Sequence, residues 1–369
     1  MAMVDPQFWH NRRVFLTGHT GFKGSWLCLW LHRLGAEVYG YALDPPTDPS
    51  LFRTARVDEL VDSTTGDIRD LAALRSAVER AQPEVVIHMA AQTLVRPSFD
   101  DPVETFSTNV MGTVHLLEAV REVPSVKAVV VVTSDKCYFN EEWVWGYRED
   151  SRLGGEDPYS SSKGCAELAT LAYRHSFYDP ARRPGAAVVA TARAGNVIGG
   201  GDWATDRLVP DILKSLLRNE PTLIRHPQAT RPWQHVMEPL NGYLMLAERL
   251  CSPDGQQFAN AWNFGPPEDS ERTVGWIIAR IYDLWGVDFE WVRDERPGPP
   301  ENTFLKLDAA KARARLHWQP RLDLPTTLEW IVDWTRGYQR GEDTRGLTLA
   351  DIDRFCGLPL GSSTSGGPR

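Results

Sequence analysis

The order of apolar and polar residues between Arg13 and Arg193 restricts this chain to one class of fold. Short apolar runs alternate there with segments of roughly ten to twenty residues that have helical periodicity. This alternation is typical of βαβ units, in which helices join parallel strands. The expected strands are RVFLT, AEVYGYAL, LVDST, EVVIHM, AVVVVTS and AAVVATAR, and the expected helices begin near Gly21, Asp70, Val103 and Tyr159. The chain is therefore predicted to have an α/β fold built on a doubly wound parallel sheet.

The composition of the sequence changes after Asn196. Glycine and proline recur in this part, as in NVIGGGDW, RHPQATRPWQH, NFGPPEDS and RPGPPENT. We predict a Rossmann-type domain over residues 1–195, which includes the helix at Tyr159. Residues 196–360 are predicted to form mainly a smaller mixed α/β lobe that binds substrate at the carboxyl edge of the sheet, with some segments returning to the first domain. The Gly/Ser-rich end, residues 361–369, is expected to be disordered.

Charge and cysteine content exclude several classes of partner. The net charge is -9, so no general attraction to nucleic acid or to an anionic membrane is expected. The N-terminal segment lacks the apolar core of a signal peptide, and the apolar stretch GSWLCLWLHRLG is too short to span a membrane. The five cysteines have neither paired spacing nor the spacing with histidine of a zinc site. We expect a cytoplasmic protein with reduced thiols and no metal.

A glycine-rich loop, TGHTGFKGSW, lies between the first predicted strand and the first predicted helix. Gly18 allows a tight turn, Gly21 lets the backbone approach a pyrophosphate, and Gly24 allows close packing of the helix. The N-terminus of the helix then offers N–H groups and the positive end of its dipole to phosphates. The spacing is G-x-x-G-x-x-G, so a glycine turn without a ligand is the alternative. The position between a strand and a helix favours a dinucleotide.

The ends of the next strands favour NAD as that dinucleotide. Asp44 ends the second strand, where a carboxylate can accept hydrogen bonds from the adenosine ribose and would repel a 2′-phosphate. A turn-forming aspartate before two prolines is the alternative, and Lys23 in the glycine loop leaves NADP open. Asp67 follows the third strand and could reach the adenine amine. The small residues of HMAAQ, His88 to Gln92, leave room for a cofactor to lie across the fourth strand.

The segment DPYSSSKGCAE holds a candidate catalytic pair, Tyr159 and Lys163. Residues four apart lie on one face of a helix. A lysine ammonium beside a phenol favours the phenolate, so the pKa of Tyr159 is expected to fall toward neutrality. A phenolate next to a nicotinamide can take the proton of an alcohol as its hydride leaves, and Ser134 at the end of AVVVVTS could share that proton. A pair on a solvated helix is the alternative, which the glycine loop and Ser134 together disfavour.

On these residues the chain resembles the extended short-chain dehydrogenase/reductase family over nearly its whole length. The motifs that carry the resemblance are the glycine loop, Asp67, Ala90-Ala91, TNVMGT with Asn109, Ser134, Tyr159-x-x-x-Lys163, Asn196 and NFG. It implies that Ser134, Tyr159 and Lys163 are the catalytic hydroxyl, base and lysine. It also implies nucleotide-sugar substrates and a homodimer or homotetramer, assembled through a four-helix bundle from the helices of LLEAVRE and CAELATLAYR.

The resemblance also assigns residues to the two ligands. NAD is expected to contact Gly18, Gly21, Phe22, Gly24, Asp44, Asp67, Ile68, Ala90, Ala91, Gln92, Asn109, Thr133, Tyr159 and Lys163. The substrate phosphates are expected at Asn196 and Arg231, since an arginine can bind a pyrophosphate through two hydrogen bonds. The backbone near Leu208 would flank the base. Further candidates on the substrate side are Arg96, Arg207, Trp203 and Trp233.

The two residues after the catalytic hydroxyl distinguish reactions within this family. Sugar 4-epimerases typically have small or neutral residues there, and 4,6-dehydratases have an acid and then usually a glutamate. Here Asp135 is followed by Lys136. With GHTGFKGSW, PPTDPSLF and RPWQHV, this pair resembles a 4,6-dehydratase branch for which CDP-glucose is the implied substrate.

The chemistry of such a dehydratase explains an adjacent acid and base. Oxidation at C4 of the sugar acidifies the proton on C5, and the hydroxyl group leaves C6. Asp135 would protonate that hydroxyl, Lys136 would remove the C5 proton, and the hydride would return to C6. A protonated lysine is a poor base, so electrostatic stabilisation of the enolate is the alternative role of Lys136. Two other functions stay open, a nucleotide-sugar epimerase or decarboxylase on the same scaffold and a non-catalytic NAD-binding regulator.

Overall fold

The computed structural model describes residues 3–288, 291–294 and 304–359. The tail that was expected to be disordered, residues 361–369, lies outside these ranges. Among the described residues, no helix combines the length and the apolarity that a membrane span requires. All five cysteines lie within the described ranges and are free thiols.

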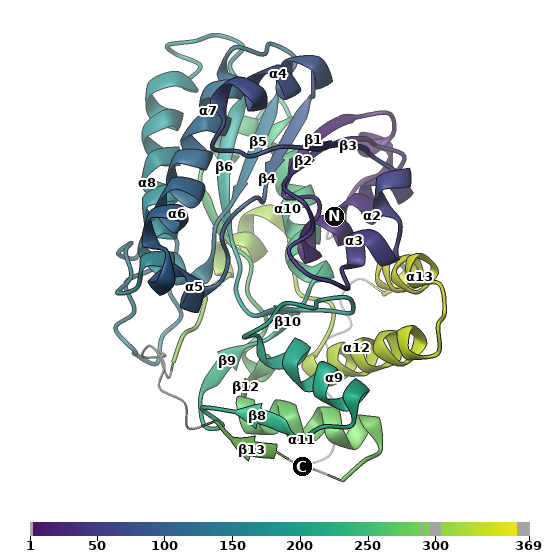
Figure 1. Ribbon diagram of the computed structural model, residues 1–369. Coiled ribbons are helices and arrows are strands. Elements are labelled where there is room, and N and C mark those ends of the chain that lie inside the picture. The colour runs from purple at the N-terminus through teal and green to yellow at the C-terminus, as the bar shows by residue number, and fades with distance from the viewer. Residues whose placement is uncertain (1–2, 289–290, 295–303, 360–369) are drawn as a thin grey trace.

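The centre of the molecule is a parallel sheet (Figure 1). Within the described residues it has seven strands, in the order β11-β6-β5-β4-β1-β2-β3. Their bounds are β1 (Arg13–Thr17), β2 (Glu37–Ala42), β3 (Asp62–Thr65), β4 (Val85–His88), β5 (Ala128–Val132), β6 (Val188–Arg193) and β11 (Ala261–Asn263). The predicted doubly wound α/β fold is confirmed. The chain reverses direction across the sheet between β1 and β4, where such folds bind their ligands.

Helices cover both faces of this sheet, so its strands are buried on both sides. On one face lie α4 (Leu71–Ala81), α7 (Gly112–Arg121) and α8 (Pro158–Phe177), and on the other α2 (Phe22–Arg33), α10 (Met237–Leu250) and α13 (Thr344–Gly357). Side chains of β5 alternate between the two cores: Val129 and Val131 pack toward α4 and α7, and Val130 and Val132 toward α2 and α10. This alternation is the two-residue period of a strand.

The helix starts predicted from sequence are close to those observed. Asp70 caps α4 by accepting a hydrogen bond from the backbone of Ala73, and Asp157 caps α8 in the same way, with Pro158 in its first turn. The helix expected near Val103 begins at Pro102 as α6 (Pro102–Phe106) and continues through a π-helical turn, Ser107–Met111, into α7. The remaining helices of the first part are α1 (Pro6–Trp9), α3 (Leu51–Thr54) and α5 (Val95–Asp100).

The second part of the chain forms a smaller lobe below the carboxyl edge of the sheet (Figure 1). Its helices are α9 (Leu208–Arg218), α11 (Val274–Trp285) and α12 (Leu324–Gln339). Three strand pairs accompany them: β7 (Val197–Ile198) with β10 (Gln234–His235), β8 (Thr222–Ile224) with β13 (Trp291–Arg293), and β9 (Thr230–Pro232) with β12 (Glu271–Thr273). A separate apolar core holds these helices together, with Ile212, Ile278 and Ile331 among its buried members.

Several elements beyond residue 196 pack with the first domain, α13 among them through its contact with α2. β11 pairs with β6, and α10 contributes Leu240 and Leu244 to the core beneath the sheet. β11 was missed from sequence because a strand of three residues is too short to show an alternating pattern. The boundary at residues 195 and 196 stays a prediction.

Candidate active site

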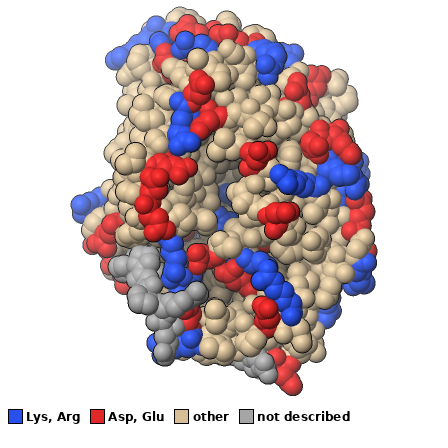
Figure 2. Space-filling view, viewed as in Figure 1, with Lys and Arg blue, Asp and Glu red and all other residues tan. Residues whose placement is uncertain are grey.

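A cavity of about 790 Å³ lies between the carboxyl ends of the sheet strands and the second lobe. Figure 2 shows its opening as a hollow in the middle of the face, with a basic side chain inside it and acidic side chains around its margin. All the predicted cofactor, catalytic and substrate residues line this cavity except Asn109. The parallel sheet brings them together because the carboxyl ends of its strands meet at one edge.

The glycine loop forms one wall of the cavity and fits a pyrophosphate. Gly18 has a φ of +76°, and a β-carbon there would lie 2.7 Å from the backbone nitrogen of Ala90, so the loop is seated against the end of β4. For a β-carbon on Gly21, the nearest described atom would be the carbonyl oxygen of Gly18 at 3.4 Å. No side chain among the described residues caps α2. Its first N–H groups are therefore available to an anion.

Lys23 points toward the catalytic end of the cavity. Its ammonium donates a hydrogen bond of 3.1 Å to the hydroxyl of Tyr243 on α10. Burial lowers the pKa of Lys23 to about 7, assisted by the positive charges of Arg207 and Lys163. Lys23 therefore does not face the exposed carboxylate of Asp44 after β2, and its position gives no support for NADP.

Two predicted cofactor residues make hydrogen bonds to the protein itself. Asp67 accepts hydrogen bonds from the backbone and guanidinium of Arg69, which hold the pKa of its carboxyl below the ordinary value. Asn109 accepts a hydrogen bond of 2.9 Å from the backbone of Gln92 and donates one of 2.8 Å to Ser162 on α8. Asn109 thus clamps the loop after β4 to the helix of the Tyr–Lys pair and lies behind the cavity wall.

The predicted catalytic residues meet at the end of β5. Ser134 caps a short 3₁₀ turn, Asp135–Cys137, and accepts a hydrogen bond from the backbone of Lys136 at 3.2 Å. Tyr159 and Lys163 are buried on the first two turns of α8 and line the same cavity. Lys136 is half-buried at the wall of the cavity.

Burial dominates the protonation of the Tyr–Lys pair. It raises the pKa of Tyr159 to about 12, and the neighbouring Ser134 hydroxyl only partly offsets this. Burial likewise lowers the pKa of Lys163 to about 8. The expectation that Lys163 would lower the pKa of Tyr159 toward neutrality is not met, because burial shifts that pKa in the opposite direction. The reason is that removing both groups from water disfavours both of their charged forms.

The surroundings of Asp135 suit a general acid. Its side chain is 3% exposed, and its Oδ1 accepts a hydrogen bond of 3.0 Å from Ser134. Among the described residues no group hydrogen-bonds to its Oδ2. Burial raises the pKa of Asp135, although the charges of Lys136 and Arg231 oppose this shift. Desolvation therefore outweighs the adjacent lysine, and the upward shift favours the protonated form that a proton donor needs.

Basic residues from both lobes approach the substrate side of the cavity. Arg207, just before α9, donates hydrogen bonds of 3.2 Å to Asp202 and 3.1 Å to Thr93, and so bridges the second lobe and the loop after β4. Arg231 lies on β9 and lines the cavity. The buried Nε of Arg96 has no hydrogen-bond partner among the described residues, which fits an anionic ligand. Trp203 and Trp233 also line the cavity.

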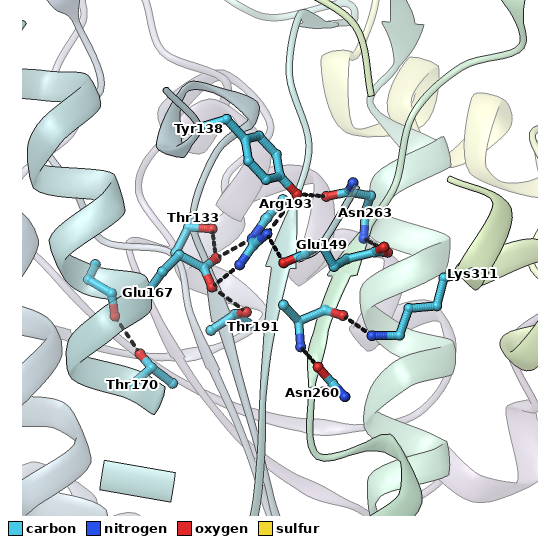
Figure 3. Close-up of polar contacts among 12 residues, drawn as sticks. Thr133, Tyr138, Glu149, Glu167, Thr170, Thr191, Arg193, Asn260, Asn263 and Lys311 are labelled. Carbon is cyan, nitrogen blue, oxygen red and sulfur yellow. Dashed lines mark hydrogen bonds and ion pairs between the residues drawn. The ribbon is translucent and has the colours of Figure 1, made fainter. Parts of the chain in front are cut away.

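A buried ion pair behind the catalytic residues was missed by the sequence analysis. Arg193, at the end of β6, faces Glu167 on α8 at 2.7 Å, and both side chains are 3% exposed (Figure 3). Glu167 also accepts hydrogen bonds from Thr133 and Thr191. The sequence feature that could have indicated this pair is the position of Glu167, one helical turn after Lys163 on the same face of the helix.

Further hydrogen bonds extend this network to the outer strand and to the next loop. Arg193 donates to the hydroxyl of Tyr138 at 2.6 Å, and that hydroxyl donates to Asn263 on β11 at 2.7 Å. The carbonyl oxygen of Glu149 accepts a further hydrogen bond from Arg193 (Figure 3). The network therefore joins α8, β6, β11 and the residue that follows β5 beside the catalytic residues of the cavity.

Comparison with known proteins gives matches over most of the chain. The family model described as GDP-mannose 4,6 dehydratase matches residues 15–259. A CDP-glucose 4,6-dehydratase of Salmonella typhimurium is 56% identical over 354 residues, which cover 96% of this chain and 98% of that protein. A dTDP-glucose 4,6-dehydratase of Streptomyces antibioticus is 27% identical, over 88% of this chain and 92% of that protein.

Solved structures have the same fold at low sequence identity. The dTDP-glucose 4,6-dehydratase DesIV of Streptomyces venezuelae, solved with NAD and TYD bound, is 22% identical with a TM-score of 0.74, over 90% of this chain and 99% of that one. A UDP-glucuronic acid 4-epimerase of Bacillus cereus, solved with UDP-glucuronic acid and NAD, is 21% identical with a TM-score of 0.75, over 88% of this chain and 99% of that one.

The buried ion pair gives a prediction about stability. Replacing Glu167 with glutamine leaves the Arg193 guanidinium buried without its counter-ion, so the free energy of unfolding should fall by about 3–5 kcal/mol. The folded-state pKa of Glu167 lies below the ordinary value of 4.5, because Arg193 outweighs the effect of burial. Its stabilisation is therefore complete above that pH and is lost as the pH falls through the folded-state pKa. Denaturant titrations of wild type and Glu167→Gln should converge in acid.

A matched control is Glu118→Gln. Glu118 pairs with Arg121 at a partly exposed site, where such pairs contribute about 0–1 kcal/mol. Equal losses in the two variants at neutral pH would contradict the importance of the buried pair.

Proposed function

Because this chain belongs to the GDP-mannose 4,6 dehydratase family, within the extended short-chain dehydrogenases/reductases, we propose that it is an NAD-dependent hydro-lyase acting on CDP-D-glucose. The product is CDP-4-dehydro-6-deoxy-D-glucose, a precursor for deoxysugar biosynthesis. The observation that carries this proposal is Asp135. Its buried carboxyl has a raised pKa and follows Ser134 in a cavity shared with Tyr159, and the relative that is 56% identical over 96% of the chain is named for the same reaction.

The cavity fits NAD along its sheet edge. The uncapped N-terminus of α2 and the open face of Gly21 suit the pyrophosphate, and Asp44 and Asp67 suit the adenosine half. When bound, NAD supplies the acceptor for the C4 hydride, a positive charge beside Tyr159 that favours the phenolate, and the hydride that returns to C6. Lys163 adds its own charge near the phenol when it is protonated.

A different residue carries out each proton transfer of the dehydration. Tyr159 takes the proton of the C4 hydroxyl, with the Ser134 hydroxyl beside it, during oxidation. Asp135, whose burial favours its protonated form, protonates the hydroxyl that leaves C6. Lys136 either takes the C5 proton or stabilises the enolate by its charge. The diphosphate is held by Arg231 and Asn196, and the start of α9 at Leu208 flanks the base.

The two alternative functions fit the site less well. A 4-epimerase needs no acid for a leaving hydroxyl, and so gives no reason for a buried Asp135. A regulator without activity gives no reason for Ser134, Tyr159 and Lys163 to line one cavity. The free thiols of all five cysteines support a reducing compartment, and we propose the cytoplasm as the place of action.

We also propose a homodimer formed through α6 and α8, which contact each other along one side of the molecule (Figure 1). Large apolar side chains are exposed there: Val103 (77%) and Phe106 (37%) on α6, Met111 (46%) in the π turn, and Leu168 (54%) and Leu171 (39%) on α8. On the helix of LLEAVRE, Leu116 and Leu117 face the core of the sheet. The apolar surface for a bundle therefore comes mainly from α8 and from the residues before α7.

A direct assay tests the function. Incubation of the protein and NAD with CDP-glucose should give a product with the alkaline absorbance of a 4-keto-6-deoxy sugar, and Tyr159→Phe should abolish it while CDP-glucose still binds. An epimerised sugar nucleotide without loss of water would support the epimerase instead. Binding of NAD and CDP-glucose without any conversion would support the regulator.

The roles of the adjacent acid and base can be separated by two variants. Lys136→Met should block elimination but permit the first hydride transfer, so reduced nicotinamide and a 4-keto-glucose nucleotide should accumulate on the enzyme. It should also stop exchange of the C5 hydrogen with solvent deuterium. Asp135→Asn should still allow C5 exchange if the enolate forms before the hydroxyl leaves, but should give little product. Exchange at the wild-type rate in Lys136→Met would leave Lys136 with an electrostatic or structural role.

The dimer proposal predicts a change in mass. Leu168→Glu puts a charge in the middle of the apolar surface on α8, so light scattering after size exclusion should show a shift from dimer to monomer. Val292→Glu serves as the control, because Val292 is 51% exposed on β13 of the other lobe. A wild-type protein that is monomeric at micromolar concentration would contradict the proposal.

A further inference from the structure

Gly195 lies against the carboxyl group of Asp135. A β-carbon on Gly195 would lie 1.7 Å from Oδ2 of Asp135 and 2.0 Å from its carboxyl carbon. Gly195 is not among the residues with positive φ, so its backbone conformation is open to alanine. The space required by Asp135, and not backbone geometry, therefore explains a glycine at this position.

The backbone at Gly195 is held on several sides and has little freedom to move away. Its carbonyl oxygen accepts a hydrogen bond of 3.1 Å from the side chain of Gln234, which also donates to the carbonyl of Phe264 at 2.9 Å. Two residues earlier, Arg193 is fixed by Glu167 at the end of β6 (Figure 3). A side chain at position 195 would therefore displace Asp135 rather than the loop.

Asp135 has only weak restraints of its own. Its Oδ1 is held by one hydrogen bond, from Ser134, and its Oδ2 has no partner among the described residues. The carboxyl group therefore occupies the space that a side chain at position 195 would fill. Lys136 follows directly, so a displaced carboxyl group that turns toward its ammonium would lose its proton more readily and become a poorer acid.

We propose that Gly195 is a positioning residue, whose missing side chain seats Asp135 as the acid that protonates the leaving C6 hydroxyl. This inference rests on the proposed dehydratase function and adds a residue to it. Gly195 has no side chain to react, and in this proposal it acts through the position and surroundings of Asp135. The first hydride transfer, which depends on Ser134, Tyr159 and Lys163, does not need it.

A double-mutant cycle tests the proposal with wild type, Gly195→Ala, Asp135→Ala and the double variant. Gly195→Ala should slow product formation about 100-fold, the loss typical of a group misplaced by about 1 Å. Reduced nicotinamide should still form on mixing with CDP-glucose. In the Asp135→Ala background the second change should have no further effect, since no carboxyl is left to displace. The double variant also has room for the added methyl group, so it should fold even if Gly195→Ala does not.

Gly346→Ala is the matched control. A β-carbon there would lie 3.2 Å from Oδ2 of Asp343, at the start of α13 and away from the cavity, so turnover should be unchanged. Additive losses in the double variant, or wild-type turnover in Gly195→Ala, would overturn the proposal. A crystal structure of Gly195→Ala with Asp135 in its original place would do so as well.

Failure of the proposed function is a separate outcome. It would appear as wild-type protein that does not convert CDP-glucose, whereas failure of the Gly195 proposal would appear in the mutant cycle with an active wild type. The crystal structure of Gly195→Ala tests the placement of Asp135 in either case.

Discussion

The ion pair between Glu167 and Arg193 is the interaction on which the site depends. An unpaired charge in the interior costs several kcal/mol, so these two side chains keep α8 and β6 in one relative position. Thr133, next to Ser134, binds the same carboxylate. Tyr138 extends the network to Asn263 on β11. The helix with Tyr159 and Lys163 is thereby fixed against the strand end that provides Ser134 and Asp135.

Burial is the main influence on the pKa values of the catalytic residues that this ion pair positions. It raises the pKa of Tyr159 to about 12 and lowers that of Lys163 to about 8, and it also raises the pKa of Asp135. One physical cause therefore disfavours the charged form of all three groups. It suits Asp135 as an acid, and it leaves Tyr159 dependent on positive charge brought close to the phenol. In a cavity that keeps water away from its side chains, a group is charged only where an opposite charge or a hydrogen-bond partner lies next to it.

The sequence predicted the sheet, the glycine loop and the convergence of nearly all the proposed site residues. Long apolar runs such as AVVVV and a glycine loop after a strand are local patterns that can be recognised without knowledge of the tertiary contacts. It did not reveal β11, α5 or the π turn, which are short segments stabilised by their neighbours. Its placement of Asn109 at the cofactor stays a prediction, and the structure adds that the amide of Asn109 joins the Gln92 loop to α8.

What the sequence alone determined is therefore the fold class and the order of chemical groups along the strand ends, since periodicity and motif spacing are local properties. The tertiary structure decided the rest, because burial and contact join residues far apart in the chain. It turned Lys23 toward Tyr243, 220 residues later, and paired Glu167 with Arg193. It also set the carboxyl of Asp135 against Gly195, a neighbour that no local pattern indicates.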